Sequence, residues 1–80
     1  NSLGRSRSCD IVLHDSTVSR DHAVLMRRES GWIVVDTNSK AGTRVNGKKV
    51  EDRAQILPGD VITLGSTSLM LKRTSEAKNL

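Results

Sequence analysis

Short apolar runs, separated at close and fairly regular intervals by turn residues, constrain the fold more than any other feature of this sequence. The runs are rich in Val, Ile and Leu, and no longer window keeps the periodicity of an amphipathic helix. The predicted strands are residues 9–13, 22–28, 32–37, 55–57, 61–65 and 68–73. Many short strands with turn signals between them are typical of an all-β sandwich or barrel.

Three turn sequences indicate where the chain reverses direction. Residues 28–31 (RESG) predict a compact hairpin connection. Asn46 and Gly47 form the preferred pair for a type I′ turn, because both central residues of that turn need a positive φ. Residues 57–60 (LPGD) predict a further tight turn, because proline fixes φ at one corner and the glycine that follows can adopt the left-handed conformation.

The length of the chain allows one domain at most. A chain this short buries only about 60% of its unfolded surface, and its core must be aliphatic because Trp32 is the only aromatic residue. We expect residues 1–73 to form the domain and residues 74–80 to be a polar tail that frays. No apolar run approaches the length of a membrane span, and the first residues lack the apolar segment of a signal peptide.

Charge and cysteine content narrow the expected partners and compartment. The chain carries 13 Lys and Arg against 9 Asp and Glu, for a formal net charge of +4. This balance favours an anionic partner, which could be nucleic acid, an anionic membrane, or a phosphorylated or acidic protein. Cys9 is the only cysteine, so no internal disulfide can form, and a reducing compartment, cytoplasmic or nuclear, is expected.

Two polar loops and one basic segment are expected to gather the functional side chains. Residues 14–20 and 38–44 each follow an apolar strand and precede another, and residues 4–8 (GRSRS) come just before the first predicted strand. In a small sandwich such loops lie at one end, where binding residues usually sit. The polar and basic candidates there are Arg5, Arg7, Ser16, Thr17, Ser19, Arg20, Asn38, Ser39, Lys40 and Thr43.

The stretch TVSRDH (17–22) contains Ser, Asp and His, yet it does not predict a hydrolase. Asp21 and His22 would point to opposite faces of the next strand, so Asp21 is poorly placed to orient the imidazole of a catalytic site. His14 and His22 are not at a spacing typical of metal ligands, and the sequence has no pair of cysteines. No metal or other cofactor is therefore expected. We expect no catalytic activity. We expect His22 to have a structural role, in which its side chain forms hydrogen bonds with the backbone of the loops.

A compact phosphate suits these residues better than nucleic acid does. Proteins that bind single strands stack bases on exposed aromatic side chains, whereas this chain has only Trp32 and its positive charges are scattered. A phosphoryl group requires fixed cations, a hydroxyl donor and free backbone amides. Arg5, Ser19, Arg20 and Lys40, on three separate segments, supply the cations and the hydroxyl.

Several motifs, in this order, resemble the forkhead-associated (FHA) domain, a β-sandwich that recognises phosphothreonine peptides. They are GR (4–5), SRDH (19–22), D..S..GT.VNG (36–47) and LPGD.I.LG (57–65). The resemblance spans residues 4 to about 72. It implies an FHA-like β-sandwich of short, mostly antiparallel strands and a phosphothreonine-dependent peptide-binding module for signalling. The implied partner is a protein phosphorylated by a Ser/Thr kinase, with no nucleic acid and no membrane.

The resemblance also implies roles for individual residues. Arg5 matches the main phosphate-binding arginine, the Ser19 hydroxyl would bond a phosphate oxygen, and Arg20 would add a further contact. The whole expected phosphopeptide-binding set is Arg5, Ser19, Arg20, Lys40, Ala41 and Thr43. Structural roles are expected for Gly4, His22, Gly42, Asn46 and Gly47.

The sequence departs from the family at two places. Ala41 stands where the family usually has an asparagine that bonds the peptide main chain, and Lys40 stands where a Ser or Thr is common. We therefore expect salt-sensitive recognition dominated by the phosphate. The alternative is a degenerate module that makes phosphate-independent protein or oligomer contacts. The chain also begins just ahead of the GR motif, so the family's first strands are expected to be missing, and a homodimer through strand pairing or swapping is a further expectation.

Overall fold

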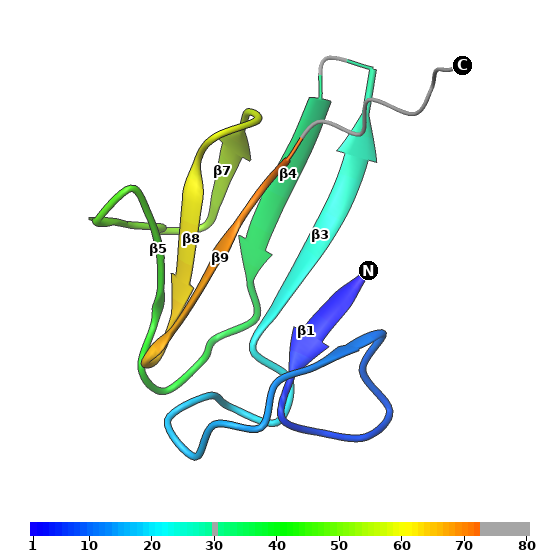
Figure 1. Ribbon diagram of the computed structural model, residues 1–80, viewed down its shortest axis with the longest axis vertical. Coiled ribbons are helices and arrows are strands. Elements are labelled where there is room, and N and C mark those ends of the chain that lie inside the picture. The colour runs from blue at the N-terminus through cyan, green and yellow to red at the C-terminus, as the bar shows by residue number, and fades with distance from the viewer. Residues whose placement is uncertain (30, 73–80) are drawn as a thin grey trace.

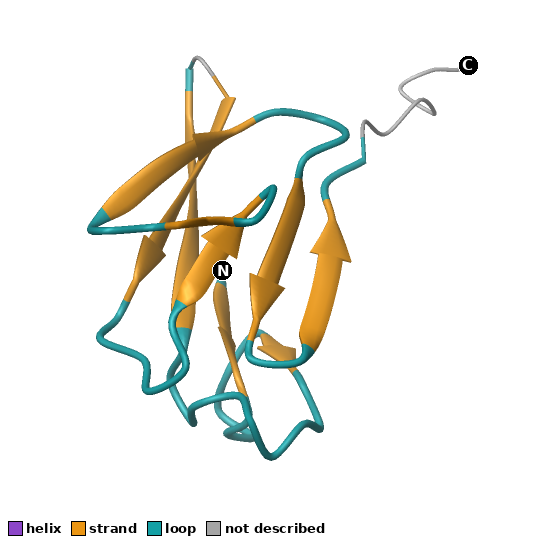
Figure 2. Ribbon diagram, turned by 90° about the vertical axis from the view of Figure 1, so that its left-hand side faces the viewer, coloured by secondary structure: helices purple, strands orange, loops and turns teal. Residues whose placement is uncertain are grey.

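The computed structural model describes residues 1–29 and 31–72, and within these ranges it contains strands and no helix. The expected tail, residues 74–80, lies outside the described residues. The strands are β1 (Ser2–Gly4), β2 (Ile11–Val12), β3 (Ala23–Arg28), β4 (Gly31–Asp36), β5 (Thr43–Val45), β6 (Lys48–Lys49), β7 (Arg53–Ile56), β8 (Val61–Leu64) and β9 (Thr67–Met70). They form two sheets that pack face to face, as Figures 1 and 2 show. The predicted all-β sandwich is confirmed.

The two sheets have the orders β2-β1-β3-β4-β7 and β6-β5-β8-β9. Every strand pair is antiparallel except β1 with β2, which is parallel. The β3–β4 hairpin is the longest ladder, and its register places Val24 opposite Val35 and Met26 opposite Ile33. Apolar pairs facing each other across two strands stabilise an antiparallel sheet. The strand order places this hairpin inside the larger sheet, with β1 on one side and β7 on the other.

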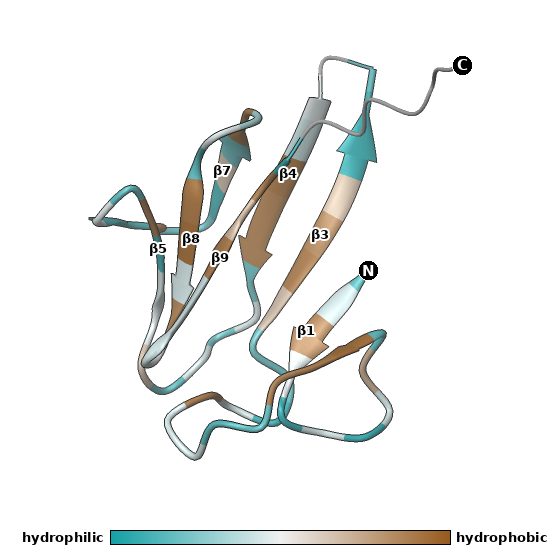
Figure 3. Cartoon of the chain, viewed as in Figure 1, coloured by the Kyte–Doolittle hydropathy of each residue, from teal (hydrophilic) through white to brown (hydrophobic). Residues whose placement is uncertain are grey.

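The core between the sheets is aliphatic, as the composition required. Leu3, Val34, Ile56 and Leu64, which come from both sheets, are all fully buried. Figure 3 shows the hydrophobic parts of β3, β4 and β8 along the lengths of these strands. Each fully buried aliphatic side chain contributes about 1.5–3 kcal/mol relative to an exposed one. Trp32 is only half buried, and it packs against this cluster from β4.

The first strand was not predicted, and the strand expected over residues 9–13 is only two residues long. Two hydrogen bonds join Ser2 to Asp10. The Ser2 N–H donates to the Asp10 carboxylate at 2.8 Å, and the Asp10 N–H donates to Ser2 Oγ at 2.9 Å. These two hydrogen bonds hold Asp10 outside the β1–β2 strand pairing. The parallel pairing therefore begins only at Ile11, which faces Leu3.

The two central residues of the turn, 46 and 47, have the positive φ values predicted for a type I′ turn. Asn46 has a φ of 52° and Gly47 a φ of 84°, and Val45 pairs with Lys48 across them. The Asn46 side chain does more than favour the turn. Its amide donates to Asp60 at 3.1 Å and its carbonyl oxygen accepts the Val61 N–H at 3.0 Å. Asn46 therefore joins the β5–β6 hairpin to the turn before β8.

Candidate functional site

Three connecting segments meet at one end of the sandwich, at the bottom of Figure 1. They are the segment between β1 and β2, the first loop (residues 13–22) and the second loop (residues 37–42). The Arg5 N–H donates to the Ser19 carbonyl oxygen at 3.0 Å, and the Lys40 N–H donates to Ser19 Oγ at 2.9 Å. The structure therefore brings Arg5, Ser19, Arg20 and Lys40 together from the three segments proposed from the sequence.

Arg5 is exposed, and its guanidinium group is oriented by one hydrogen bond. Nε donates to the Val18 carbonyl oxygen at 3.0 Å. The terminal nitrogens of Arg5 make no hydrogen bond to the described residues, and neither does the guanidinium group of Arg20, which is also exposed. Val18 is 1% exposed, so the carbonyl that orients Arg5 belongs to a residue anchored in the core. An oriented guanidinium with free donors is a suitable ligand for a phosphate oxygen.

Close packing of backbone at Gly4 sets the distance between the basic segment and the first loop. A Cβ on Gly4 would lie 2.1 Å from the Arg20 carbonyl oxygen and 2.9 Å from Cys9 Sγ, so no larger residue fits. Cys9 is buried, and its thiol donates to the same Arg20 carbonyl oxygen at 3.3 Å. The Ser6 N–H also donates to that oxygen, at 3.1 Å. The backbone of Arg20 is therefore held, while its side chain stays free.

Ser19 and His22 form the junction between the two loops. Ser19 Oγ accepts the Lys40 N–H, which leaves the hydroxyl hydrogen of Ser19 without an acceptor among the described residues. The Ser19 N–H donates to Nδ1 of the fully buried His22 at 3.0 Å. Because Nδ1 accepts, the proton of the neutral ring is on Nε2, and Nε2 donates to the Gly42 carbonyl oxygen at 2.8 Å. His22 thus links the first loop to the second.

Asp36 organises the second loop, a role that the sequence analysis did not assign. Its carboxylate accepts hydrogen bonds from the Ser39 hydroxyl at 2.5 Å, the Thr43 hydroxyl at 2.7 Å, and the N–H groups of Asn38 and Ser39. Ser39 Oγ in turn accepts the Gly42 N–H at 3.0 Å. Burial would raise the pKa of Asp36, but these hydrogen bonds outweigh burial and hold the pKa below its ordinary value of 3.8. The D-x-x-S spacing was the available signal, since Asp commonly bonds backbone a few residues ahead.

Thr43 lies elsewhere than the sequence analysis placed it. It begins β5 instead of ending the loop, so its side chain points into the sandwich and is 0% exposed. Its hydroxyl donates to Asp36. The expected contact between Thr43 and a bound peptide is therefore not available in this structure, and Thr43 supports the loop from beneath. Ala41 and Lys40 are exposed, as a ligand contact would require.

The first loop is attached to the β8–β9 turn by a second carboxylate that the sequence analysis missed. Asp15 accepts the Thr17 hydroxyl and the Thr67 hydroxyl, each at 2.6 Å, and Thr17 Oγ1 accepts the Ser66 N–H at 2.8 Å. Hydrogen bonds from Thr17, followed by the one from Thr67, lower the pKa of Asp15. The first loop belongs to the larger sheet and the turn to the smaller one, so these bonds join the two sheets next to Ser19.

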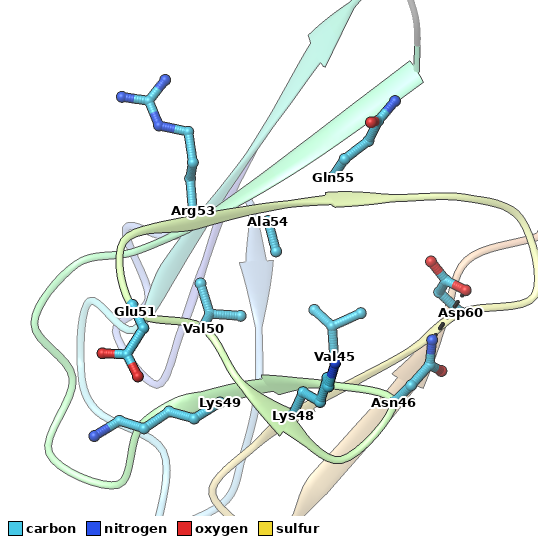
Figure 4. A pocket seen from close by; sticks show the side chains of 10 residues that line it. All are labelled: Val45, Asn46, Lys48, Lys49, Val50, Glu51, Arg53, Ala54, Gln55 and Asp60. Carbon is cyan, nitrogen blue, oxygen red and sulfur yellow. Dashed lines mark hydrogen bonds between the residues drawn. The ribbon is translucent and has the colours of Figure 1, made fainter.

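Residues 1–29 and 31–72 contain no group of three or more His, Cys, Asp or Glu side chains that could hold a metal ion, and no helix long and apolar enough to cross a membrane. A pocket of about 420 Å³ opens between the β5–β6 hairpin and β7 (Figure 4). Its lining includes Val45, Val50 and Ala54 together with Lys48 and Arg53.

Comparisons with known proteins agree with this fold. Residues 1–65 match the family model of the FHA domain. The ABC transporter ATP-binding/permease protein Rv1747 of Mycobacterium tuberculosis is 40% identical over 68 residues, which are 85% of this chain and 8% of that protein. The glycogen accumulation regulator GarA of the same species is 41% identical over 69 residues, which are 86% of this chain and 42% of that protein.

A solved structure from a structural and functional analysis of phosphothreonine-dependent FHA domain interactions is also similar. It superposes with a TM-score of 0.86 at 32% identity, covering 94% of this chain and 77% of that one. The chain spans less than half the length of the two curated relatives named above. The resemblance first identified from the motifs is confirmed by sequence and by structure. The chain belongs to the FHA domain family.

Proposed function

We propose that this chain is a phosphothreonine-dependent peptide-binding module without catalytic activity. One observation carries the proposal: Ser19 joins the Arg5 segment through its carbonyl oxygen and the Lys40 loop through its hydroxyl oxygen. The backbones of three segments that carry Arg5, Arg20 and Lys40 are thereby held beside a hydroxyl group whose hydrogen has no acceptor among the described residues. The similar solved structure comes from a study of phosphothreonine-dependent interactions of FHA domains, which supports the same ligand here.

In the proposed complex, Arg5, Arg20 and Lys40 balance the charge of the phosphate and Ser19 donates to one of its oxygens. A phosphothreonine carries about −1.5 to −2 charges and offers three acceptor oxygens. Each charge-assisted hydrogen bond contributes roughly 1.5–3 kcal/mol. The partner is a protein phosphorylated by a Ser/Thr kinase, and the module recruits it within a larger signalling protein. Ala41 offers no side-chain donor, so the phosphate contributes most of the affinity.

The first test is fluorescence anisotropy with a labelled phosphothreonine peptide library and the matched unphosphorylated library. We expect binding only to the phosphorylated library, and a loss of about ten-fold or more in affinity for Arg5→Ala, because one charge-assisted bond is removed. Arg28→Ala is the matched control, because Arg28 is exposed at the far end of β3, opposite the loops. Equal binding of both libraries, or no effect of Arg5→Ala, would contradict the proposal.

An alternative use of the fold is phosphate-independent contact with a second copy of the chain. Among the described residues β9 pairs only with β8, so its other edge has no strand partner there. Met70 at the end of β9 is 55% exposed. Unpaired edges favour strand pairing between chains. Sedimentation equilibrium would show a dimer that phosphopeptide does not alter, whereas a monomer at all concentrations would exclude this alternative.

We also propose a reducing compartment, such as the cytoplasm, because Cys9 is a free, buried thiol among the described residues. Its bond to the Arg20 carbonyl oxygen would be lost if the sulfur were oxidised. Nucleic acid is not proposed as a partner. Binding of a labelled oligonucleotide with a steep salt dependence, and no preference for phosphorylated peptide, would overturn that exclusion.

A further inference from the structure

The β3–β4 hairpin is apolar on both faces of the larger sheet. Val34 is fully buried in the core, so the side chains that alternate with it point away from the smaller sheet. Four aliphatic residues form two cross-strand pairs on this outer face, namely Val24 with Val35 and Met26 with Ile33. These four are half-buried, and none of them packs against the core cluster. An antiparallel sheet with one face in water normally alternates apolar and polar residues, so this outer face has the composition of a covered surface.

A row of four side chains crosses the outer face from one side to the other. The register joins its members in the order Ser2, Val24, Val35 and Arg53. Residues directly opposite each other in a ladder share a face of the sheet. Figure 4 agrees, since Arg53 and Ala54 extend to opposite sides of β7 and Ala54 packs against the core cluster. The row therefore has two aliphatic residues at its centre and one polar residue at each end.

The two ends of the row carry opposite charges. Beside Ser2 lies the Asp10 carboxylate, whose Oδ2 atom accepts the Ser2 N–H at 2.8 Å and the Ser2 hydroxyl at 3.2 Å. These hydrogen bonds lower the pKa of Asp10, so its carboxylate is ionised at neutral pH. At the other end, Arg53 forms an ion pair with Asp52 at 3.4 Å, but the two side chains are 63% and 79% exposed. Exposed ion pairs are weak, so Arg53 remains able to pair with another carboxylate.

A second copy of the chain fits this face when a two-fold axis runs along the strands, midway between β3 and β4. In the strand order β2-β1-β3-β4-β7, this rotation places β3 of one copy over β4 of the other, and β1 over β7. The aliphatic pairs of the two copies then lie over one another, and the Asp10 carboxylate of each copy lies over Arg53 of the other. Each contact occurs twice by symmetry. Two sheets with nearly aligned strands, stacked about 10 Å apart, are a common packing in β-proteins.

Charge distinguishes this arrangement from the other aligned one. An axis across the strands would place β7 over β7 and β1 over β1, which brings the two Arg53 side chains together and the two Asp10 carboxylates together. With the axis along the strands, the like charges that approach each other are the two Arg28 side chains. Arg28 is exposed and pairs with Gly31 at the end of the hairpin, so it lies over a residue without a side chain and can extend past the rim into water. The opposite charges at the two sides of the face therefore select one orientation.

We propose that the outer face of the larger sheet is the interface of a homodimer in which the strands of the two copies run in the same direction. The aliphatic pairs form its centre, and an ion pair between Asp10 and Arg53 forms on each side. This interface is distinct from the free edge of β9, which belongs to the smaller sheet. The axis direction places the loops of both copies at the same end of the dimer. Under the proposed function, on which this last consequence rests, two phosphate sites face one partner, and a doubly phosphorylated partner binds more tightly through effective concentration.

The first measurement is sedimentation equilibrium of the unmodified domain at concentrations up to about 1 mM. We expect a weak, reversible dimer, because a standard interface buries roughly 800 Å² per partner and only four half-buried aliphatic residues form the centre of this one. Val35→Glu should raise the dissociation constant by about ten-fold or more, because the dimer would bury an unpaired charge. Thr63→Glu is the matched control, since Thr63 is half-buried on β8 in the other sheet. Urea unfolding followed by Trp32 fluorescence checks that each variant is folded.

The second measurement tests the two ion pairs and requires no change at a half-buried position. Arg53→Glu and Asp10→Lys should each raise the dissociation constant by about three- to ten-fold, since each exposed pair contributes little but two pairs are reversed. An equimolar mixture of the two variants should dimerise within about two-fold of the unmodified domain, because every charge contact of the mixed dimer joins opposite charges. Arg44→Glu, the same change of charge at an exposed position on β5, should have no effect.

Three results would overturn the proposed interface. The first is a monomeric unmodified domain throughout this concentration range. The second is a dimer that Val35→Glu leaves intact, or that Met70→Glu dissociates instead, because either result would locate the contact elsewhere, such as at the β9 edge. The third is a mixture of Arg53→Glu and Asp10→Lys that dimerises no more tightly than either variant alone. Each result concerns the interface only, since phosphopeptide binding that depends on Arg5 would still support the proposed function.

Discussion

The two loops at the end of the sandwich where we propose that the ligand binds are held in different ways. The first loop is held from outside, by residues distant in the sequence: the β1–β2 segment, the β8–β9 turn and the second loop all bond to it. The second loop is held from within, because Asp36, Ser39 and Thr43 bond one another over a short stretch of chain. The first loop therefore depends on correct assembly of both sheets, whereas the second carries most of its own order.

This difference matters for the proposed ligand. Ser19 and Arg20 lie on the first loop, and Lys40 and Ala41 lie on the second. A phosphate placed between them would be sensitive to any change in the relative position of the loops. His22 and Ser19 set this position together. The two ring nitrogens of His22 bond to one loop each, and Ser19 Oγ accepts the Lys40 N–H.

The largest expected effect comes from breaking the junction itself. His22→Ala leaves the Ser19 N–H and the Gly42 carbonyl oxygen without their partner and creates a cavity at a fully buried position. We expect a loss of about 3–5 kcal/mol in the free energy of unfolding. Urea unfolding followed by Trp32 fluorescence measures it. The exposed His14→Ala should change stability very little, and a comparable loss there would show that the effect is not specific to the junction.

A smaller loss is expected when the second loop loses its central carboxylate. Asp36→Asn removes the charge that accepts from Ser39 and Thr43, and should cost about 1–2 kcal/mol because Asp36 is only partly shielded from water. The pKa of Asp36 is below 3.8 in the folded protein. Its stabilisation is thus complete above pH 3.8 and is lost as the pH falls below that value.

The measurement for Asp36 is urea unfolding at a series of pH values from neutral to acidic. The unmodified domain should lose more stability than Asp36→Asn as the pH falls through the acidic range. Some acid dependence should persist in the variant, because hydrogen bonds also lower the pKa of Asp10, Asp15 and Asp60. Identical pH profiles for the two proteins would show that Asp36 does not stabilise the loop through its charge.

The smallest expected effect tests the external attachment of the first loop. Thr17→Val removes the hydroxyl that donates to Asp15 and accepts the Ser66 N–H, at an exposed position. We expect a loss of about 1 kcal/mol in stability and a weaker affinity for phosphopeptide, because Ser19 lies on the same loop. Thr63→Val is the control, since among the described residues its hydroxyl is hydrogen-bonded only to that of Ser68, on the smaller sheet. If both variants bind phosphopeptide equally well, the attachment does not position the phosphate site.

Much of the fold could be predicted because its signals are local. Asn46 and Gly47 have the positive φ values of a type I′ turn because Asn tolerates the left-handed region and Gly, which has no Cβ, adopts it without strain. The gathering of the polar loops at one end of the sandwich was also predictable, since polar segments between apolar strands lie at the ends of a sandwich. The first strand was missed because Ser2, Leu3 and Gly4 carry no strand pattern by themselves. They are extended because β3 on one side and β2 on the other pair with them.

The sequence by itself determined the all-β class, the main hairpin turns and the set of cations and hydroxyls available for an anion, because composition and turn chemistry act over a few residues. Only the tertiary structure decided which of those side chains are free. Thr43 points inward because β5 begins at that residue, and its hydroxyl donates a hydrogen bond to Asp36 instead of to a ligand. The register of β5 with β6 likewise places Arg44 opposite Lys49. Burial, strand register and contacts between distant loops depend on the whole chain, so no local pattern could specify them.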